Sequence, residues 1–113
     1  MHKLRYRQVH LDFHTSPQIP GIGASFDRTR WQETLKAGHV DSITLFAKCH
    51  HGWSYHPTEV GKMHPHLDFD LLRAQFDACK EIDVNAPVYL SAGVDNVASE
   101  QHPEWREIGA DGR

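Results

Sequence analysis

The sequence lacks the features that mark membrane-spanning, secreted and polyanion-binding proteins. No apolar run approaches the roughly 20 residues that span a bilayer. The N-terminal stretch MHKLRYRQVHLDFH has basic residues but not the continuous apolar segment of a signal peptide. The net charge of -3 offers no basic surface for nucleic acid. We therefore expect no membrane and no nucleic-acid partner, and a cytoplasmic location.

Cysteine is scarce and histidine is abundant. The two cysteines, Cys49 and Cys79, fall at a predicted strand end and on a predicted helix, and two residues cannot form a disulfide framework. We expect free thiols in a reducing compartment. The 113 residues suffice for one domain, and 39% hydrophobic residues are typical of a globular chain rather than a disordered one. Ten histidines, several of them clustered, are the anomaly.

Three strands are predicted from hydrophobic periodicity. Residues 6–14 alternate between apolar and polar side chains, which is the pattern of a half-buried strand. Residues 42–48 and 86–92 are nearly continuous apolar runs, typical of strands buried on both faces of a parallel sheet. The tail beyond them is polar and shows no convincing long helix.

Two helices are predicted between these strands. The first covers residues 28–39, with Asp27 as its N-cap. The second runs over residues 70–82 and begins at Asp68 or Asp70. Residues 48–66 read as a long polar loop.

This alternation predicts an α/β fold with a parallel three-stranded β-α-β-α-β segment, joined by right-handed crossovers that place both helices on one face. Such a segment leaves two unpaired edges and apolar strips. We interpret residues 1–113 as the first part of a (β/α)8 TIM barrel, truncated or cleaved. The alternative is a small open α/β sandwich stabilised by self-association.

Polar side chains follow each strand, whereas the connections from helix to strand are short. Because ligands of α/β folds bind at the carboxyl ends of parallel strands, these residues are candidates for a site. Any one of them has an ordinary explanation as a loop residue, and Lys48 could instead form a buried ion pair with Asp12. The candidates are His10, Asp12, His14, Lys48, His50, His51, Trp53, Tyr55 and Asp95.

The segments FAKCHHGWSYHPTEVGKMHPHLDFDLL, PVYLSAG and HPEW resemble the N-terminal barrel segment of a group of hypothetical bacterial glycoside hydrolases. That group is related to the α-L-fucosidases and often carries a β-galactosidase-type trimerisation domain. In α-L-fucosidases the equivalent second strand reads Ala-Lys-His-His-Asp-Gly-Phe, and the paired histidines contact sugar hydroxyls. Here Cys49 replaces the first histidine and no aspartate precedes Gly52.

The resemblance implies a carbohydrate substrate and no cofactor. The histidines and Lys48 would hydrogen-bond the sugar hydroxyls, and Trp53 or Tyr55 would stack on the apolar side of the ring. Glycosidases use two carboxylates about 5–10 Å apart, and the related fucosidases carry their nucleophile after a fourth strand. We therefore expect no catalytic residue in this chain, and an inactive fragment when it is isolated.

Two other classes remain open. One is a metal-dependent, amidohydrolase-like barrel, with His10, Asp12 and His14 on one face of the first strand. On an extended strand, however, the two histidines would lie about 13 Å apart and could not easily share one ion. The other is a non-catalytic carbohydrate-binding or inert barrel fragment, which would bind sugar weakly or not at all.

Overall fold

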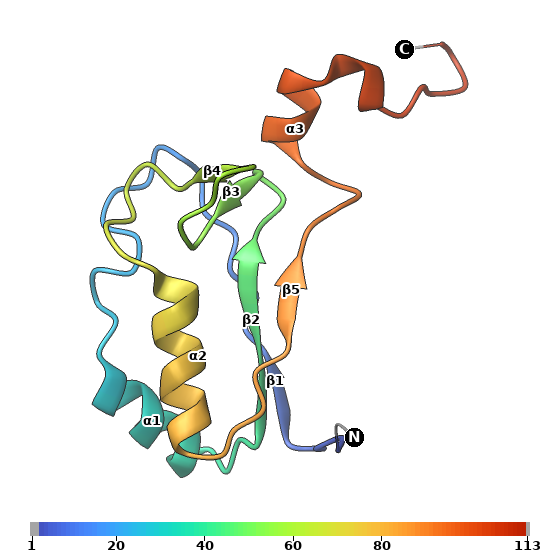
Figure 1. Ribbon diagram of the computed structural model, residues 1–113. Helices are drawn as coiled ribbons and strands as arrows, with labels where there is room; N and C mark the ends of the chain where they lie inside the picture. The colour runs from blue at the N-terminus through green and yellow to red at the C-terminus, as the bar shows by residue number, and fades with distance from the viewer. Residues whose placement is uncertain (1–2, 113) are drawn as a thin grey trace.

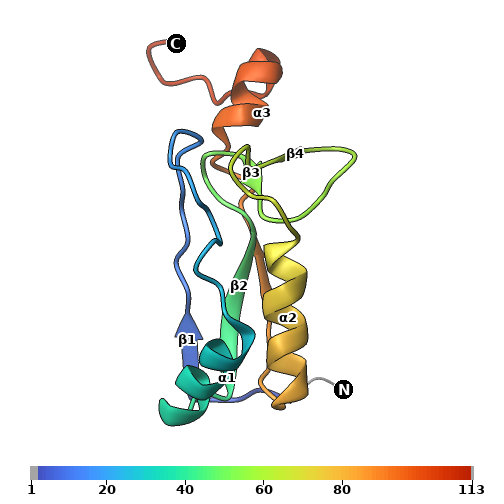
Figure 2. The same cartoon turned by 90° about the vertical axis from the view of Figure 1, so that its left-hand side faces the viewer.

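The computed structural model describes residues 3–112. Its elements, in chain order, are β1 (Gln8–His10), α1 (Arg28–Ala37), β2 (Ser42–Lys48), β3 (Trp53–Ser54), β4 (Lys62–Met63), α2 (Leu71–Glu81), β5 (Val88–Leu90), α3 (Asn96–Gln101) and a 3-10 turn, Pro103–Trp105. The helices α1 and α2 lie together on one side of the sheet, and α3 extends beyond the strand ends (Figure 1, Figure 2). None of the helices in this range is long and apolar enough to cross a membrane.

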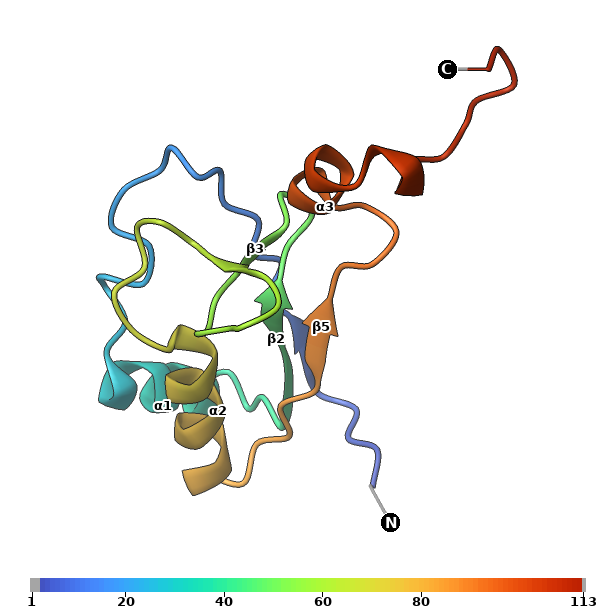
Figure 3. The ribbon, with the colours of Figure 1, turned by 45° about the horizontal axis from the view of Figure 1, so that its top comes forward.

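The three predicted strands run parallel and in sequential order. β2 is central, with β1 paired to one side (Val9 opposite Ile43) and β5 to the other (Phe46 opposite Tyr89). The expected β-α-β-α-β order is therefore confirmed, with both crossover helices on the same face (Figure 3). All three strands end at the same edge of the sheet.

The prediction of a purely parallel sheet was wrong, because the loop after β2 contains two short strands. Gly52 N–H donates to the carbonyl of Cys49 at 2.9 Å, and this tight turn reverses the chain. The returning β3 pairs antiparallel with β2, Ser54 opposite Lys48, and β4 then pairs parallel with β3. The sheet is mixed.

Two strands are shorter than predicted. β1 ends at His10 rather than near residue 14, because Asp12 N–H donates back to the His10 carbonyl at 3.1 Å and bends the chain. β5 covers Val88–Leu90 rather than 86–92, and Pro87 before it has no N–H to donate to the ladder.

An aspartate N-cap precedes each of the two crossover helices. The Asp27 carboxylate accepts from Arg30 N–H at 2.7 Å, as predicted, and Asp70, rather than Asp68, accepts from Arg73 N–H at 2.8 Å. Each bond satisfies a backbone donor that has no partner inside the helix. The caps thus fix where each helix begins.

The core has two clusters of buried side chains. One lies between the helices and the sheet and consists of Leu35, Ile43, Leu45, Cys79 and Val84. The other lies nearer the carboxyl ends of the strands and consists of Ile22, Phe46, Cys49, Tyr55, Leu67 and Leu71. Both cysteines are free and buried, and burial raises the pKa of the Cys79 thiol. Apolar side chains of β5 stay uncovered, with Val88 50% and Leu90 59% exposed.

Candidate functional site

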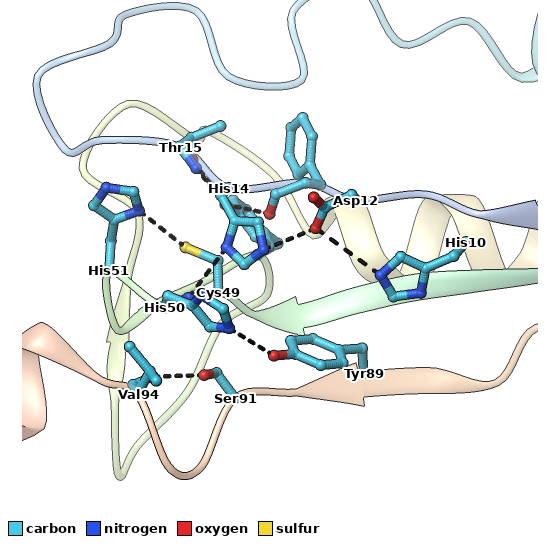
Figure 4. Close-up of polar contacts among 12 residues, drawn as sticks. His10, Asp12, His14, Thr15, Cys49, His50, His51, Tyr89, Ser91 and Val94 are labelled. Atoms are coloured by element: carbon cyan, nitrogen blue, oxygen red, sulfur yellow. Dashed lines mark hydrogen bonds and ion pairs between the residues drawn. The ribbon is translucent and has the colours of Figure 1, made fainter.

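Polar side chains gather where β1, β2 and β5 end, as Figure 4 shows. His10, Asp12 and His14 come from β1 and the segment after it. Lys48 is the last residue of β2, His50 lies in the turn that follows, and Asp95 lies after β5. The parallel arrangement of the three strands brings these side chains to one edge, as the sequence predicts.

His14 links Asp12 to His50. Its Nδ1 accepts a hydrogen bond from the backbone N–H of His50 at 3.3 Å, and its Nε2 lies 2.8 Å from Oδ1 of Asp12 (Figure 4). A neutral ring whose Nδ1 accepts must carry its proton on Nε2. These contacts therefore assign the tautomer in which Nε2–H faces the carboxylate. The rings of His14 and His50 pack with their centroids 4.2 Å apart.

His10 lies on the other side of the same carboxylate. Its Nε2 is 3.9 Å from Oδ1 of Asp12, and its ring meets the edge of Phe46 at a centroid distance of 5.3 Å. The expected separation of His10 and His14 on an extended strand was wrong, because the bend after His10 brings both imidazoles to Asp12. Within residues 3–112, no group of three or more histidine, cysteine or acidic side chains is arranged to hold a metal ion.

Lys48 is paired with Asp95, and the suggested ion pair with Asp12 was wrong. Nζ of Lys48 contacts Oδ2 of Asp95, whose side chain is only 8% exposed. The other oxygen of Asp95 accepts from Ala98 N–H at 2.8 Å and caps α3. The chain after β5 crosses the end of β2, and this places Asp95, rather than Asp12, against the ammonium group.

The remaining candidates lie around the turn and hairpin after β2. His51 is half-buried, and its Nδ1 is 3.8 Å from Sγ of Cys49, apart from the His50 ring (Figure 4). Trp53 is half-buried on β3 and meets the ring of His64 edge-on at a centroid distance of 6.3 Å. These two residues do not join the cluster around Asp12.

Tyr55 is buried in the core, with 1% of its surface exposed. Its hydroxyl accepts from Thr15 N–H at 3.2 Å and donates to the carbonyl of Phe13 at 3.1 Å. Burial raises the pKa of this phenol. The contacts hold the segment after β1 against the hairpin, so the geometry favours a packing role for Tyr55 over stacking on a sugar.

Sequence reasoning missed two residues that shape this edge. Tyr89, on β5, places its hydroxyl 2.9 Å from Nε2 of His50. His64 is 1% exposed; its Nδ1 accepts from His66 N–H and its Nε2–H donates to the carbonyl of Ser16 at 3.0 Å. Burial lowers the pKa of His64. A tyrosine in an otherwise aliphatic strand was a signal for the first; nothing in the sequence separated His64 from the other histidines.

The arrangement offers imidazole nitrogens and a held ammonium group, which suit the hydroxyls of a polar ligand. Each of the two carboxylates at this edge has at least one side-chain partner. Asp12 faces two histidines, and Asp95 serves Lys48 and the α3 cap.

Comparisons with known proteins give two matches. Residues 27–113 match the family described as hypothetical glycosyl hydrolase 6. A solved structure of alpha-L-fucosidase isoenzyme 2 from Paenibacillus thiaminolyticus is 52% identical, with a TM-score of 0.93. That match covers 97% of this chain and 17% of the fucosidase chain, so the present chain spans only a small part of its relative's length. No curated protein matches the chain.

Proposed function

The chain belongs to the glycoside hydrolase family described as hypothetical glycosyl hydrolase 6, and from this premise we propose that it is the sugar-binding N-terminal portion of an α-L-fucosidase-like domain. In this proposal the β1, β2 and β5 units are the first three of a (β/α)8 barrel. The substrate is a carbohydrate held at the carboxyl ends of these strands.

The position of His14, His50 and Lys48 at or just after the carboxyl ends of two adjacent strands, with the two imidazoles packed together, supports this proposal most directly. A pyranose presents several hydroxyls, each able to donate and accept, and imidazole and ammonium groups supply matching partners. Asp12 and Asp95 fix His14 and Lys48 respectively, so the groups that face a ligand need little ordering when it binds. Such preorganisation favours binding.

Catalytic carboxylates are proposed to lie outside this chain. A glycosidase needs one carboxyl group as acid and a second as base or nucleophile. Asp12 and Asp95 instead hold cationic or imidazole partners, and their contacts suit positioning rather than proton transfer. Because Tyr55 is covered, Trp53, half-buried on β3, is the proposed stacking residue, for a part of the ligand that extends beyond the cluster around Asp12.

Alanine substitution tests the proposed sugar contacts in the protein that carries this chain. His50→Ala and His14→Ala should each lower kcat/KM for an aryl α-L-fucoside by the equivalent of about 1–3 kcal/mol, through lost hydrogen bonds to the sugar. His39→Asn is the control, since His39 is exposed between α1 and β2, at the opposite end of the sheet, and asparagine tolerates its φ of 52°. Unchanged kinetics in both alanine variants would count against sugar binding here.

A further inference from the structure

Tyr89 reaches the histidine cluster from β5, and none of the proposed sugar contacts includes it. Its hydroxyl lies 2.9 Å from Nε2 of His50 (Figure 4). We propose that Tyr89 is a positioning residue, which holds the His50 imidazole in the orientation that meets a sugar hydroxyl. This inference rests on the proposed sugar-binding function and deepens it.

The Tyr89 ring is fixed by the sheet beneath it. Tyr89 lies opposite Phe46 in the register of β5 and β2, and the two rings stack with centroids 4.4 Å apart and an interplanar angle of 28°. The His10 ring meets Tyr89 edge-on at 6.0 Å. Because aromatic contacts of this kind restrain the ring, its hydroxyl is a fixed point at the strand end.

His50 has less support of its own. It lies in the turn after β2, where its backbone N–H donates to His14 and its carbonyl accepts from Asn96 N–H at 3.1 Å. These bonds hold the main chain, and the His14 ring packs against the imidazole at a centroid distance of 4.2 Å, but neither holds a ring nitrogen of His50. In the described part of the chain, the ring nitrogens of His50 have one hydrogen-bond partner, the Tyr89 hydroxyl.

Packing does not require that hydroxyl. A phenylalanine ring would fill the same stack on Phe46, so the oxygen matters through its bond to His50. This bond lies in an exposed position, where a hydrogen bond adds little to stability because water replaces it. It does hold Nε2 of His50 at the Tyr89 hydroxyl and so fixes the orientation of the imidazole, which leaves Nδ1 as the ring nitrogen available to a ligand.

Enzyme kinetics test the positioning role. In the protein that carries this chain, Tyr89→Phe should raise KM for an aryl α-L-fucoside about 3- to 10-fold, the range expected for one net hydrogen bond, with a smaller change in kcat. In a His50→Ala background the same substitution should have no further effect. Tyr6→Phe is the matched control, because Tyr6 is 88% exposed and precedes β1. An equal loss with and without His50 would overturn the proposal, since Tyr89 would then act independently.

A spectroscopic measurement on the sugar-free protein separates this inference from the proposed function. Nitrogen-15 shifts of the His50 ring, assigned by their absence in His50→Ala, report how the proton is shared between Nδ1 and Nε2. We expect Tyr89→Phe to move the Nε2 resonance, because this nitrogen loses its hydrogen-bond partner, and Tyr6→Phe to leave both resonances unchanged. Unchanged shifts in Tyr89→Phe would overturn the positioning role even if the enzyme cleaves fucosides. A wild-type protein that neither binds nor cleaves sugar would instead overturn the proposed function, and with it the sugar-orienting part of this inference.

Discussion

Gly52 is the residue that lets the chain after β5 close over the end of β2. Its φ of +86° lies in the left-handed region that favours glycine. A Cβ at this position would collide with Oδ1 of Asp95 and would lie 2.7 Å from Cβ of Val97. The missing side chain therefore allows Asp95 to reach Lys48 and to cap α3.

Replacing Gly52 with alanine should destabilise the protein by about 1–3 kcal/mol, because the new Cβ meets both backbone strain and the start of α3. Denaturant-induced unfolding measures this change. Gly93→Ala is the matched control, since no atom lies within 4 Å of where its Cβ would be. Equal stability of the two variants would show that the close approach at Gly52 is not needed.

At the scale of single residues, the sequence predicted which polar side chains reach the site but not their partners. Periodicity and strand order place Lys48 at the end of β2. Whether it meets Asp12 or Asp95 depends on how a loop 47 residues further along the chain crosses it. The burial of Tyr55 was equally hidden, because an aromatic residue in a polar loop can stack on a ligand or anchor the loop.

At the scale of elements, helix starts were the most predictable feature. The capping aspartate acts on backbone donors two or three residues away, so its signal is local in the sequence. The structure confirmed Asp27 and decided between Asp68 and Asp70 in favour of the second.

Asp70→Ala should therefore lower the stability of the fold by about 1 kcal/mol, because Arg73 N–H loses its acceptor at the start of α2. Thermal unfolding measures the change. Asp68→Ala, two residues before the cap, should leave the melting temperature nearly unchanged. A larger effect at Asp68 than at Asp70 would contradict the observed cap.

Strand ends and the hairpin after β2 were less predictable. Alternation of apolar and polar residues continues to residue 14, but the backbone bond between Asp12 and His10 bends the chain out of the sheet. β3 and β4 are two residues each, too short for any periodicity, and they form because the turn at Gly52 returns the chain to β2. Both features depend on turns rather than on side-chain pattern.

At the scale of the whole molecule, the predicted resemblance to fucosidase-related glycoside hydrolases is confirmed. The sequence indicated this resemblance through the run Lys48–Trp53, which follows a buried strand, as the similar run does in the α-L-fucosidases. The barrel itself stays a prediction. The sequence also indicated a sheet with an open edge. The exposed side chains of Val88 and Leu90 on β5 are consistent with such an edge.

The 113-residue chain on its own should self-associate, because β5 presents an unpaired edge and uncovered apolar side chains. Light scattering should give a mass above that of one chain, and Leu90→Lys should lower it. Val60→Lys is the control, since Val60 is fully exposed in the loop between β3 and β4.

We also expect no hydrolysis of aryl glycosides by the isolated 113-residue chain. A monomer that unfolds cooperatively and cleaves one of these substrates would contradict both expectations.

The central claim, a sugar site at the carboxyl ends of β1, β2 and β5, is tested most directly by a crystal structure of the protein that carries this chain, soaked with L-fucose. The account predicts sugar hydroxyls within hydrogen-bond distance of the His50 ring and of Lys48, with Tyr89 still bonded to His50. A fucose molecule bound only at another face, with this strand edge left to solvent, would contradict it.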